Sequence, residues 1–145
     1  EIYFLSKELL HLKFQPKLYT ENELIESNRV LIINKVGILA DLYAFSNLAY
    51  VGAGFTTGVH SVLEPAIYHN AISFGPNYNI VDMAISLVEN DLAYIIKTEN
   101  DLHKFYCLLD KKNDLNKITS NMKKFINQQP LASKNILNAI FKHEN

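Results

Sequence analysis

Short apolar runs alternate along this chain with longer segments whose apolar residues recur at helical spacing. Four runs have the length and apolar character of strands: 30–33, 48–51, 71–74 and 93–96. The first of them, Val-Leu-Ile-Ile, also has the β-branched content of a strand buried on both faces. Strands that alternate with helices build a parallel sheet with right-handed crossovers. We therefore predict an α/β fold, a Rossmann-like parallel sheet flanked by helices.

Helices are predicted between and around these runs. The first extends from Ser6 to Leu12, and the polar segment 15–27, which contains Pro16, is expected to be a connecting loop. A helix is expected over residues 61–70 and another from Asn79, whose apolar residues form one stripe. Three more are expected after residue 100, with apolar stripes in the segments 102–109, 115–126 and 136–141.

Length and composition set limits on the classes of function. The 145 residues suffice for one domain with a proper core, so we expect a single domain over residues 1–145. A net charge of −1 gives no electrostatic basis for binding nucleic acid. The single cysteine, Cys107, excludes an internal disulfide and is expected to be a buried, inert thiol in a reducing compartment. No apolar run reaches the roughly 20 residues that cross a bilayer, and no signal peptide is visible.

The segment after the second run carries three glycines, Gly52, Gly54 and Gly58. Glycine lets the backbone turn sharply and lets a ligand approach closely, and amides at the start of a following helix favour an anion. The spacing is neither the dinucleotide G-x-G-x-x-G pattern nor a Walker loop. From spacing alone, a simple tight turn explains these glycines as well as a ligand site does.

Glu64 has two competing interpretations. Ser61 and Glu64 have the S-x-x-E spacing of a capping box, in which the glutamate folds back onto the serine amide. The carboxylate could instead accept two hydrogen bonds from a vicinal diol such as a ribose. Taken without further context, the spacing favours the capping box.

Three further groups stand at expected strand ends. His60 precedes the helix predicted over residues 61–70 and could donate to a phosphate, although a lone loop histidine is usually an ordinary surface residue. Gly75, Pro76 and Asn77 follow the third run, where turn chemistry alone also explains them. Lys35 and Gly37 follow the first run. The other histidines show no metal-ligand spacing, so we expect no metal and no cofactor.

Taken together, these residues resemble the C-terminal half of the 3-deoxy-D-manno-octulosonic acid (Kdo) transferases, which attach Kdo to the lipid A precursor of bacterial lipopolysaccharide. The resemblance extends from Glu1 to about Leu109. Its specific part is the glycine–His60–Leu63–Glu64–Pro65 block followed by Phe-Gly-Pro at 74–76. It implies the C-terminal half of a GT-B fold, a glycosyltransferase of two Rossmann-like domains.

The resemblance also implies roles. This chain would hold the donor substrate, CMP-Kdo, with Glu64 on the ribose hydroxyls. The turn with Gly52, Gly54, Thr57 and Gly58, together with His60 and Ser61, would face the phosphate and Kdo. Gly75, Pro76 and Asn77 would close the site, and Gly37 would line it. The catalytic carboxylate and the lipid A precursor site would belong to an N-terminal domain absent from this chain, so no catalytic residue is expected here and the chain alone should be inactive.

The chain departs from the family pattern at three positions. Ser61 stands where the family usually has asparagine, Asn34 where aspartate is common and Met83 where a glutamate is usual. Two alternatives stay open: another GT-B domain that uses a UDP-sugar, and a non-catalytic nucleotide-binding module. We interpret the start of the chain at Glu1 as a cut within a larger protein. The parent is expected at the cytoplasmic face of the bacterial inner membrane, and weak self-association of the fragment through Phe55 or Tyr78 is a hypothesis.

Overall fold

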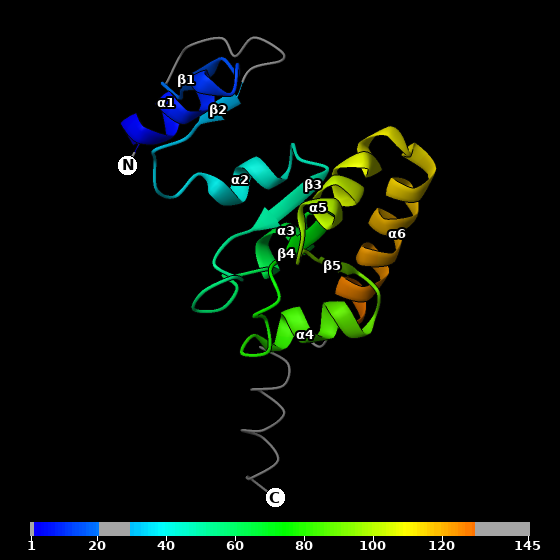
Figure 1. The fold of residues 1–145 in the computed structure, drawn as a ribbon. Helices are drawn as coiled ribbons and strands as arrows, with labels where there is room; N and C mark the ends of the chain where they lie inside the picture. Colours follow the sequence, from blue (N-terminus) through cyan, green and yellow to red (C-terminus); the bar gives the residue numbers. More distant parts are fainter. Residues whose placement is uncertain (1, 21–29, 130–145) are drawn as a thin grey trace, which may run out of the picture. The chain divides into compact units, whose positions relative to one another are not determined.

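The computed structural model describes residues 2–20 and 30–129 (Figure 1). The chain divides at Leu39 and Ala40 into two compact units, and each is described by itself. The helix predicted in the segment 136–141 lies outside the described residues.

The first unit contains helix α1 (Ile2–His11) and two parallel strands, β1 (Pro16–Leu18) and β2 (Val30–Ile32). Strand β2 was predicted, but β1 lies in a segment that we expected to be a loop. Proline is compatible with the first position of a strand, where Pro16 stands opposite Val30. Helix α1 begins at Ile2, before the predicted start at Ser6.

The second unit is built on a three-stranded parallel sheet in the order β3 (Leu48–Val51), β4 (Ala71–Phe74), β5 (Ala93–Ile95). The helices around it are α2 (Leu39–Tyr43), α3 (Leu63–Ile67), α4 (Asp82–Glu89), α5 (Glu99–Tyr106) and α6 (Lys112–Gln128), with a 3₁₀ turn at Cys107–Asp110. The predicted α/β fold with a parallel sheet flanked by helices is therefore confirmed.

The core lies on both faces of β4, whose four residues are all buried. Ile72 and Phe74 point to one face, where they pack with buried residues of α3, α4 and α6, among them Leu87 and Met122. Ala71 packs on the opposite face with Phe105 of α5 and Leu108. Full burial of a large apolar side chain contributes about 1.5–3 kcal/mol, so this central strand anchors the unit.

Helix α5 begins at a capping box formed by Thr98 and Asp101. The Asp101 amide donates to Thr98 Oγ1 (3.2 Å), and the Thr98 amide donates to Asp101 Oδ2 (3.0 Å). The Thr98 hydroxyl and the Lys97 amide donate to the same carboxylate oxygen. These bonds lower the pKa of Asp101 below its ordinary value. The hydrogen bond from the Thr98 side chain has the largest effect, and the bond from the Lys97 amide has the second largest.

Two glycine loops at the carboxyl ends of β3 and β4 pack backbone against backbone. A Cβ atom on Gly54 would lie 2.6 Å from the Gly75 nitrogen, and one on Gly75 would lie 2.5 Å from the Gly54 carbonyl carbon. The Asn77 amide donates to the Gly54 carbonyl (2.8 Å) across this contact. Any side chain at either glycine therefore pushes the loops apart, whereas a Cβ on Gly52 meets nothing within 4 Å.

The first prediction concerns the capping box. Thr98→Ala should lower the free energy of unfolding by about 1 kcal/mol at neutral pH and raise the pKa of Asp101, measured by NMR titration. Because the folded-state pKa of Asp101 is depressed, its contribution is present above the unfolded pKa and is lost as the pH falls through the folded value. The matched control is Ser61→Ala, which should leave stability unchanged. Equal losses in the two variants would contradict the assignment.

The second prediction concerns the loop contact. Gly54→Ala and Gly75→Ala should each lower the free energy of unfolding by about 1–3 kcal/mol, because the added methyl group meets backbone atoms that cannot rotate away. Gly52→Ala, two residues from Gly54, should change it by less than about 0.5 kcal/mol. Chemical denaturation of the three variants measures the difference, and a Gly54→Ala variant as stable as Gly52→Ala would show that the contact carries no constraint.

Candidate functional site

The two predicted glycine loops of the second unit meet where β3 and β4 end. The first loop follows Val51 and the second follows Phe74, and these two residues pair in the sheet. Besides the Gly54–Gly75 contact, Asn77 joins the loops: its carbonyl accepts from the Val59 amide (3.0 Å) and its Nδ2 donates to the Thr56 carbonyl (3.3 Å). The two loops therefore lie side by side at this edge of the sheet.

A hollow of about 220 Å³ lies between these loops. It is lined by Thr56, Thr57, Gly58, Asn77, Asn79 and Ile80. Thr57 and Asn77 are exposed and present polar side chains. Gly58 has a φ of +115°, a left-handed conformation that side chains rarely adopt, so the wall of this hollow requires glycine.

Several amides of the first loop already have partners within the protein. The amides of Thr56 and Gly58 both donate to the Ala53 carbonyl (3.1 and 3.2 Å), and the His60 amide donates to the Gly52 carbonyl (3.3 Å). Helix α3 has only five residues, so its dipole gives an anion little electrostatic stabilisation. A ligand phosphate at this edge would therefore depend on side chains such as Thr57, His60 and Asn77, and on the open backbone at Gly52.

The capping-box interpretation of Glu64 is wrong. Helix α3 begins at Leu63 with Val62 as N-cap and has no side-chain cap, so Ser61 lies outside the helix. The Glu64 side chain is exposed in the first turn and makes no hydrogen bond or ion pair with another described residue. His60 and Ser61 are exposed as well. The carboxylate is therefore free to accept hydrogen bonds from a ligand.

Gly37 belongs to the first unit, where it is exposed and has a φ of +92°. Asn34 and Lys35 beside it are also exposed. A shared site of Gly37 with the loops of the second unit stays a prediction.

A buried polar cluster near Glu64 was missed by the sequence analysis. Asn70, which is 1% exposed, donates through Nδ2 to the carbonyls of Tyr43 (3.0 Å) and Pro65 (3.3 Å). The Ser46 hydroxyl bonds to the Asn70 side-chain oxygen and to the Tyr43 carbonyl (3.2 Å). An asparagine between a helix and a strand resembles an ordinary turn residue, so no local signal could have identified this role.

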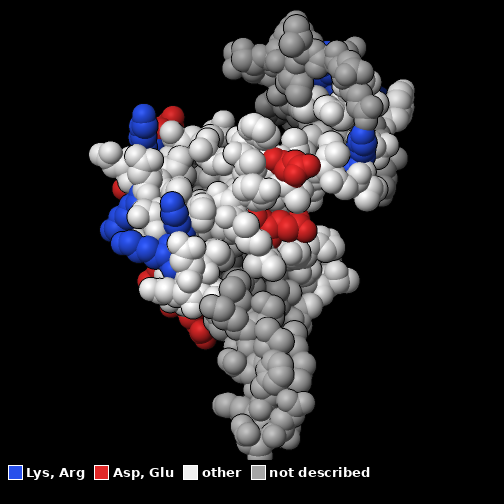
Figure 2. All heavy atoms as spheres, turned by 180° about the vertical axis from the view of Figure 1, so that it is seen from behind, with Lys and Arg blue, Asp and Glu red and all other residues white. Residues whose placement is uncertain are grey.

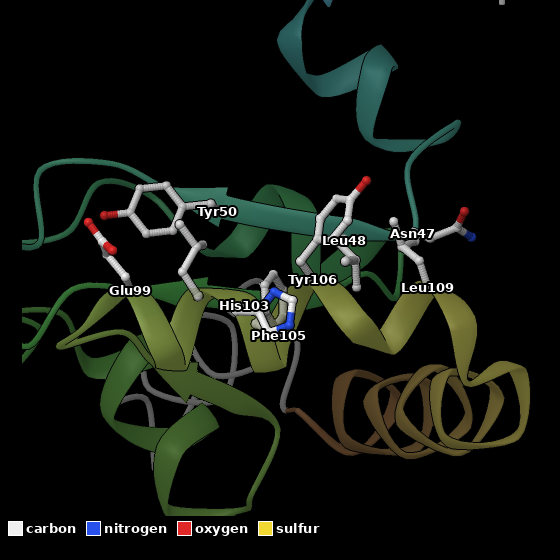
Figure 3. Close-up of a pocket in the computed structure, with 9 residues that line it drawn as sticks. Asn47, Leu48, Tyr50, Glu99, His103, Phe105, Tyr106 and Leu109 are labelled. Carbon is white, nitrogen blue, oxygen red and sulfur yellow. The ribbon is translucent and has the colours of Figure 1, made fainter. Parts of the chain in front are cut away.

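A second hollow, of about 700 Å³, lies between β3 and α5 (Figure 3). Tyr50 and Glu99 stand at one end of it and Asn47 and Leu109 at the other. Its lining is mostly apolar, which does not suit a nucleotide phosphate. His103 lines it, and the half-buried Cys107 has its Sγ 3.6 Å from His103 Nε2, so this thiol is less buried than expected.

The described residues give no further sign of a charged binding surface or a metal site. On the face shown in Figure 2, lysines gather along one edge and most of the surface is uncharged, which gives that face no broad basic area. Within residues 2–20 and 30–129, no group of three or more His, Cys, Asp or Glu side chains is placed to hold a metal ion. No described helix is long and apolar enough to cross a membrane.

Curated proteins of similar sequence are mainly Kdo transferases. That of Rickettsia conorii is 28% identical over 128 residues, which span 85% of this chain and 28% of that protein. That of Rickettsia prowazekii is 30% identical over 111 residues, 74% of this chain and 24% of that protein. A bifunctional glycosyltransferase/methyltransferase of Fusobacterium nucleatum is 27% identical over 111 residues, 74% of this chain and 17% of that protein. The chain thus spans about a quarter of the length of the curated relatives named first, and no family model matches it.

A solved structure shares the fold. The C-terminal CMP-Kdo binding domain of WaaA from Acinetobacter baumannii matches 88% of this chain and 68% of its own, with a TM-score of 0.75 and 17% sequence identity. This likeness confirms the predicted fold, the C-terminal half of a GT-B arrangement. With the sequence relatives, it shows that the chain belongs to the 3-deoxy-D-manno-octulosonic acid transferase family and has the fold of its C-terminal domain.

Proposed function

We propose that this chain binds CMP-Kdo and is the donor-binding half of a glycosyltransferase that transfers Kdo to the lipid A precursor in lipopolysaccharide synthesis. The observation that carries the proposal is the carboxylate of Glu64, which is exposed and caps no helix. It lies in the first turn of α3, the helix that follows the first glycine loop. The solved structure that shares this fold is a CMP-Kdo binding domain, and this supports the choice of nucleotide.

In this proposal each part of the site meets one part of the donor. The ionised Glu64 carboxylate accepts hydrogen bonds from both ribose hydroxyls, because it is acceptor-only and has room for two donors. Thr57, His60 and Asn77 contact the phosphate or the Kdo residue, and Gly52 allows close approach. The donor carries one phosphate rather than a diphosphate, so its charge does not require a metal ion.

The small size of the hollow between the loops supports a site that is completed by a second domain. Small-molecule pockets usually measure about 300–1,000 Å³. The 220 Å³ between the loops is smaller, so we infer that it takes only one end of the donor. The remaining walls, the acceptor site and the catalytic carboxylate would come from the N-terminal domain of the parent, which would act at the cytoplasmic face of the bacterial inner membrane.

The third prediction tests Glu64 with a pair of ligands. Calorimetry should show that Glu64→Gln weakens CMP binding by about tenfold or more, since a hydrogen bond to a charged group contributes about 1.5–3 kcal/mol. The variant should bind 2′,3′-dideoxy-CMP as the original chain does, because that ligand lacks the diol. Stability should be unchanged, since the carboxylate caps no helix.

The control for this experiment is Glu89→Gln, an exposed glutamate at the end of α4. It should bind both ligands as the original chain does. Tighter binding of UMP or UDP than of CMP would favour a UDP-sugar domain instead. Unaltered CMP binding by Glu64→Gln would remove the proposed role of the carboxylate.

The fourth prediction is that the 145-residue chain binds CMP-Kdo without transferring Kdo. Transfer needs a positioned acceptor and a catalytic group that the resemblance assigns to the other domain. Incubation with CMP-Kdo and lipid A precursor should therefore give no product by mass spectrometry. Kdo-bearing lipid at a level above a boiled control would contradict the assignment of this chain to the donor half.

A further inference from the structure

Strand β3 forms one edge of the three-stranded sheet, and its outer side carries unpaired backbone groups. The strand pairs with β4 on one side only. The Asn47 carbonyl, just before β3, accepts from the Ala71 amide at the start of β4 (3.0 Å). Because the backbone groups of successive residues in a strand point to alternate sides, those of Leu48 and Tyr50 point away from β4. Two N–H and two C=O groups thus line the edge, and no described strand pairs with them.

An apolar hollow lies directly beside this edge. The hollow of about 700 Å³ between β3 and α5 is lined by Leu48 and Tyr50 of the strand. Leu102 and Tyr106 of α5 and Leu109 of the 3₁₀ turn line it from the other side. All of these large side chains except Leu48 are exposed, Tyr106 to 63%. A contiguous apolar surface of this kind marks an interaction site.

The opposite edge of the sheet, strand β5, has different surroundings. A hollow of about 460 Å³ beside it is lined by Tyr94 of the strand and by the charged side chains of Asp91, Asp114 and Lys117. Charged side chains at an edge strand oppose pairing with another chain, because pairing would bury them. Beside β3, Glu99 is the only carboxylate of the described residues that lines the hollow. The β3 edge is therefore the one suited to association.

We propose that this edge binds a second copy of the chain, with the two β3 strands antiparallel about a twofold axis at Ala49. In that register Leu48 pairs with the partner's Tyr50, and Tyr50 pairs with the partner's Leu48. Each pair exchanges two hydrogen bonds, so the outward backbone groups of both copies are satisfied. The two Ala49 side chains meet at the axis in a close, non-hydrogen-bonded pair, where methyl groups fit. The same patch serves both copies, as a twofold interface requires.

The charges along the hollow favour a second copy in this orientation. Glu99 stands at one end of the hollow and Leu109 at the other (Figure 3). The antiparallel arrangement brings the Glu99 end of each copy to the Leu109 end of the other and keeps the two Glu99 carboxylates apart. Lys111 and Lys112 follow Leu109 and, together with Asp110, give that end a net positive charge. The ends that meet are therefore complementary in charge.

Of the two residues that we hypothesised for self-association, Phe55 adjoins this surface. It lines a smaller hollow of about 290 Å³ that shares Tyr50 and Leu102 with the larger one. Tyr78 instead packs against Phe74 of the core, with the ring centroids 5.5 Å apart. The proposed interface therefore extends along α5 toward Phe55 and leaves out Tyr78.

The fifth prediction tests the register of the two strands by a cross-link in the 145-residue chain. In a Cys107→Ser background, Ala49→Cys should form a disulfide-linked dimer with oxidised glutathione as the oxidant. The reason is that the Cα atoms of a non-hydrogen-bonded antiparallel pair lie about 4.5 Å apart, within the range of a disulfide. Ala93→Cys, at the start of the other edge strand, is the matched control and should stay unlinked. Non-reducing electrophoresis measures the linked fraction.

Association itself is measured by sedimentation equilibrium from about 1 μM to about 1 mM chain, the range of weak affinities. The original chain should show a monomer–dimer equilibrium. Tyr106→Glu should weaken dimerisation about tenfold or more, because it replaces an exposed aromatic ring of the interface with a charge. Tyr68→Glu, at an exposed tyrosine that follows α3, should have no effect. Both variants should keep the melting temperature of the original chain, since both side chains are exposed.

Amide exchange measured by NMR separates this interface from any other dimer. The amides of Leu48 and Tyr50 should become protected as the concentration rises, and Tyr106→Glu should remove that protection. A monomer at every concentration would overturn the proposal, and uptake of the apolar dye ANS by that monomer would assign the hollow to another ligand. A dimer that Tyr106→Glu leaves intact and Ala49→Cys does not link would overturn it as well. Tyr106→Glu should bind CMP as the original chain does, so neither result decides the proposed function.

Discussion

The contact between Gly54 and Gly75 is the constraint on which the carboxyl edge of the sheet depends. Two backbones can approach this closely only where neither residue has a side chain, and here the approach joins the loops after two paired strands. Asn77 joins the two loops as well: its amide and its side chain donate hydrogen bonds, and its carbonyl accepts one. The hollow between the loops therefore depends on this main-chain contact, which sets the distance between its two sides.

Much of the fold followed from local patterns, and the errors have local causes as well. Strands β3 and β4 match their predicted runs, although only β4 is buried along its whole length, whereas Tyr50 of β3 is exposed. The position of Pro65 in the sequence could have excluded the capping box between Ser61 and Glu64. With Ser61 as N-cap, Pro65 would occupy the position whose N–H makes the first bond of the helix. With Val62 as N-cap, that bond comes from Ala66 (3.2 Å), and Pro65 falls where no N–H is needed.

The candidate site was predictable only in part. The glycines and the Phe-Gly-Pro loop stand at strand ends, so their meeting at one edge follows from a parallel sheet. The partnership of Asn70 with Tyr43 and Ser46 spans 27 and 24 positions and has no periodic signal. Sequence reasoning therefore found the residues whose backbones meet at this edge and missed the buried polar residues between α2, α3 and β4. Strand β1 was missed for a simpler reason, because Pro16 was taken as a break rather than as a permitted first residue.

The Asn70 amide also has a consequence for folding kinetics. Its bonds close loops of more than twenty residues, and such closures cost chain entropy before they gain any stabilisation. Contacts of this range form with the sheet rather than ahead of it. The cluster should thus behave as one cooperative unit in hydrogen exchange, so that separating α2 from α3 releases Tyr43 and Ser46 together.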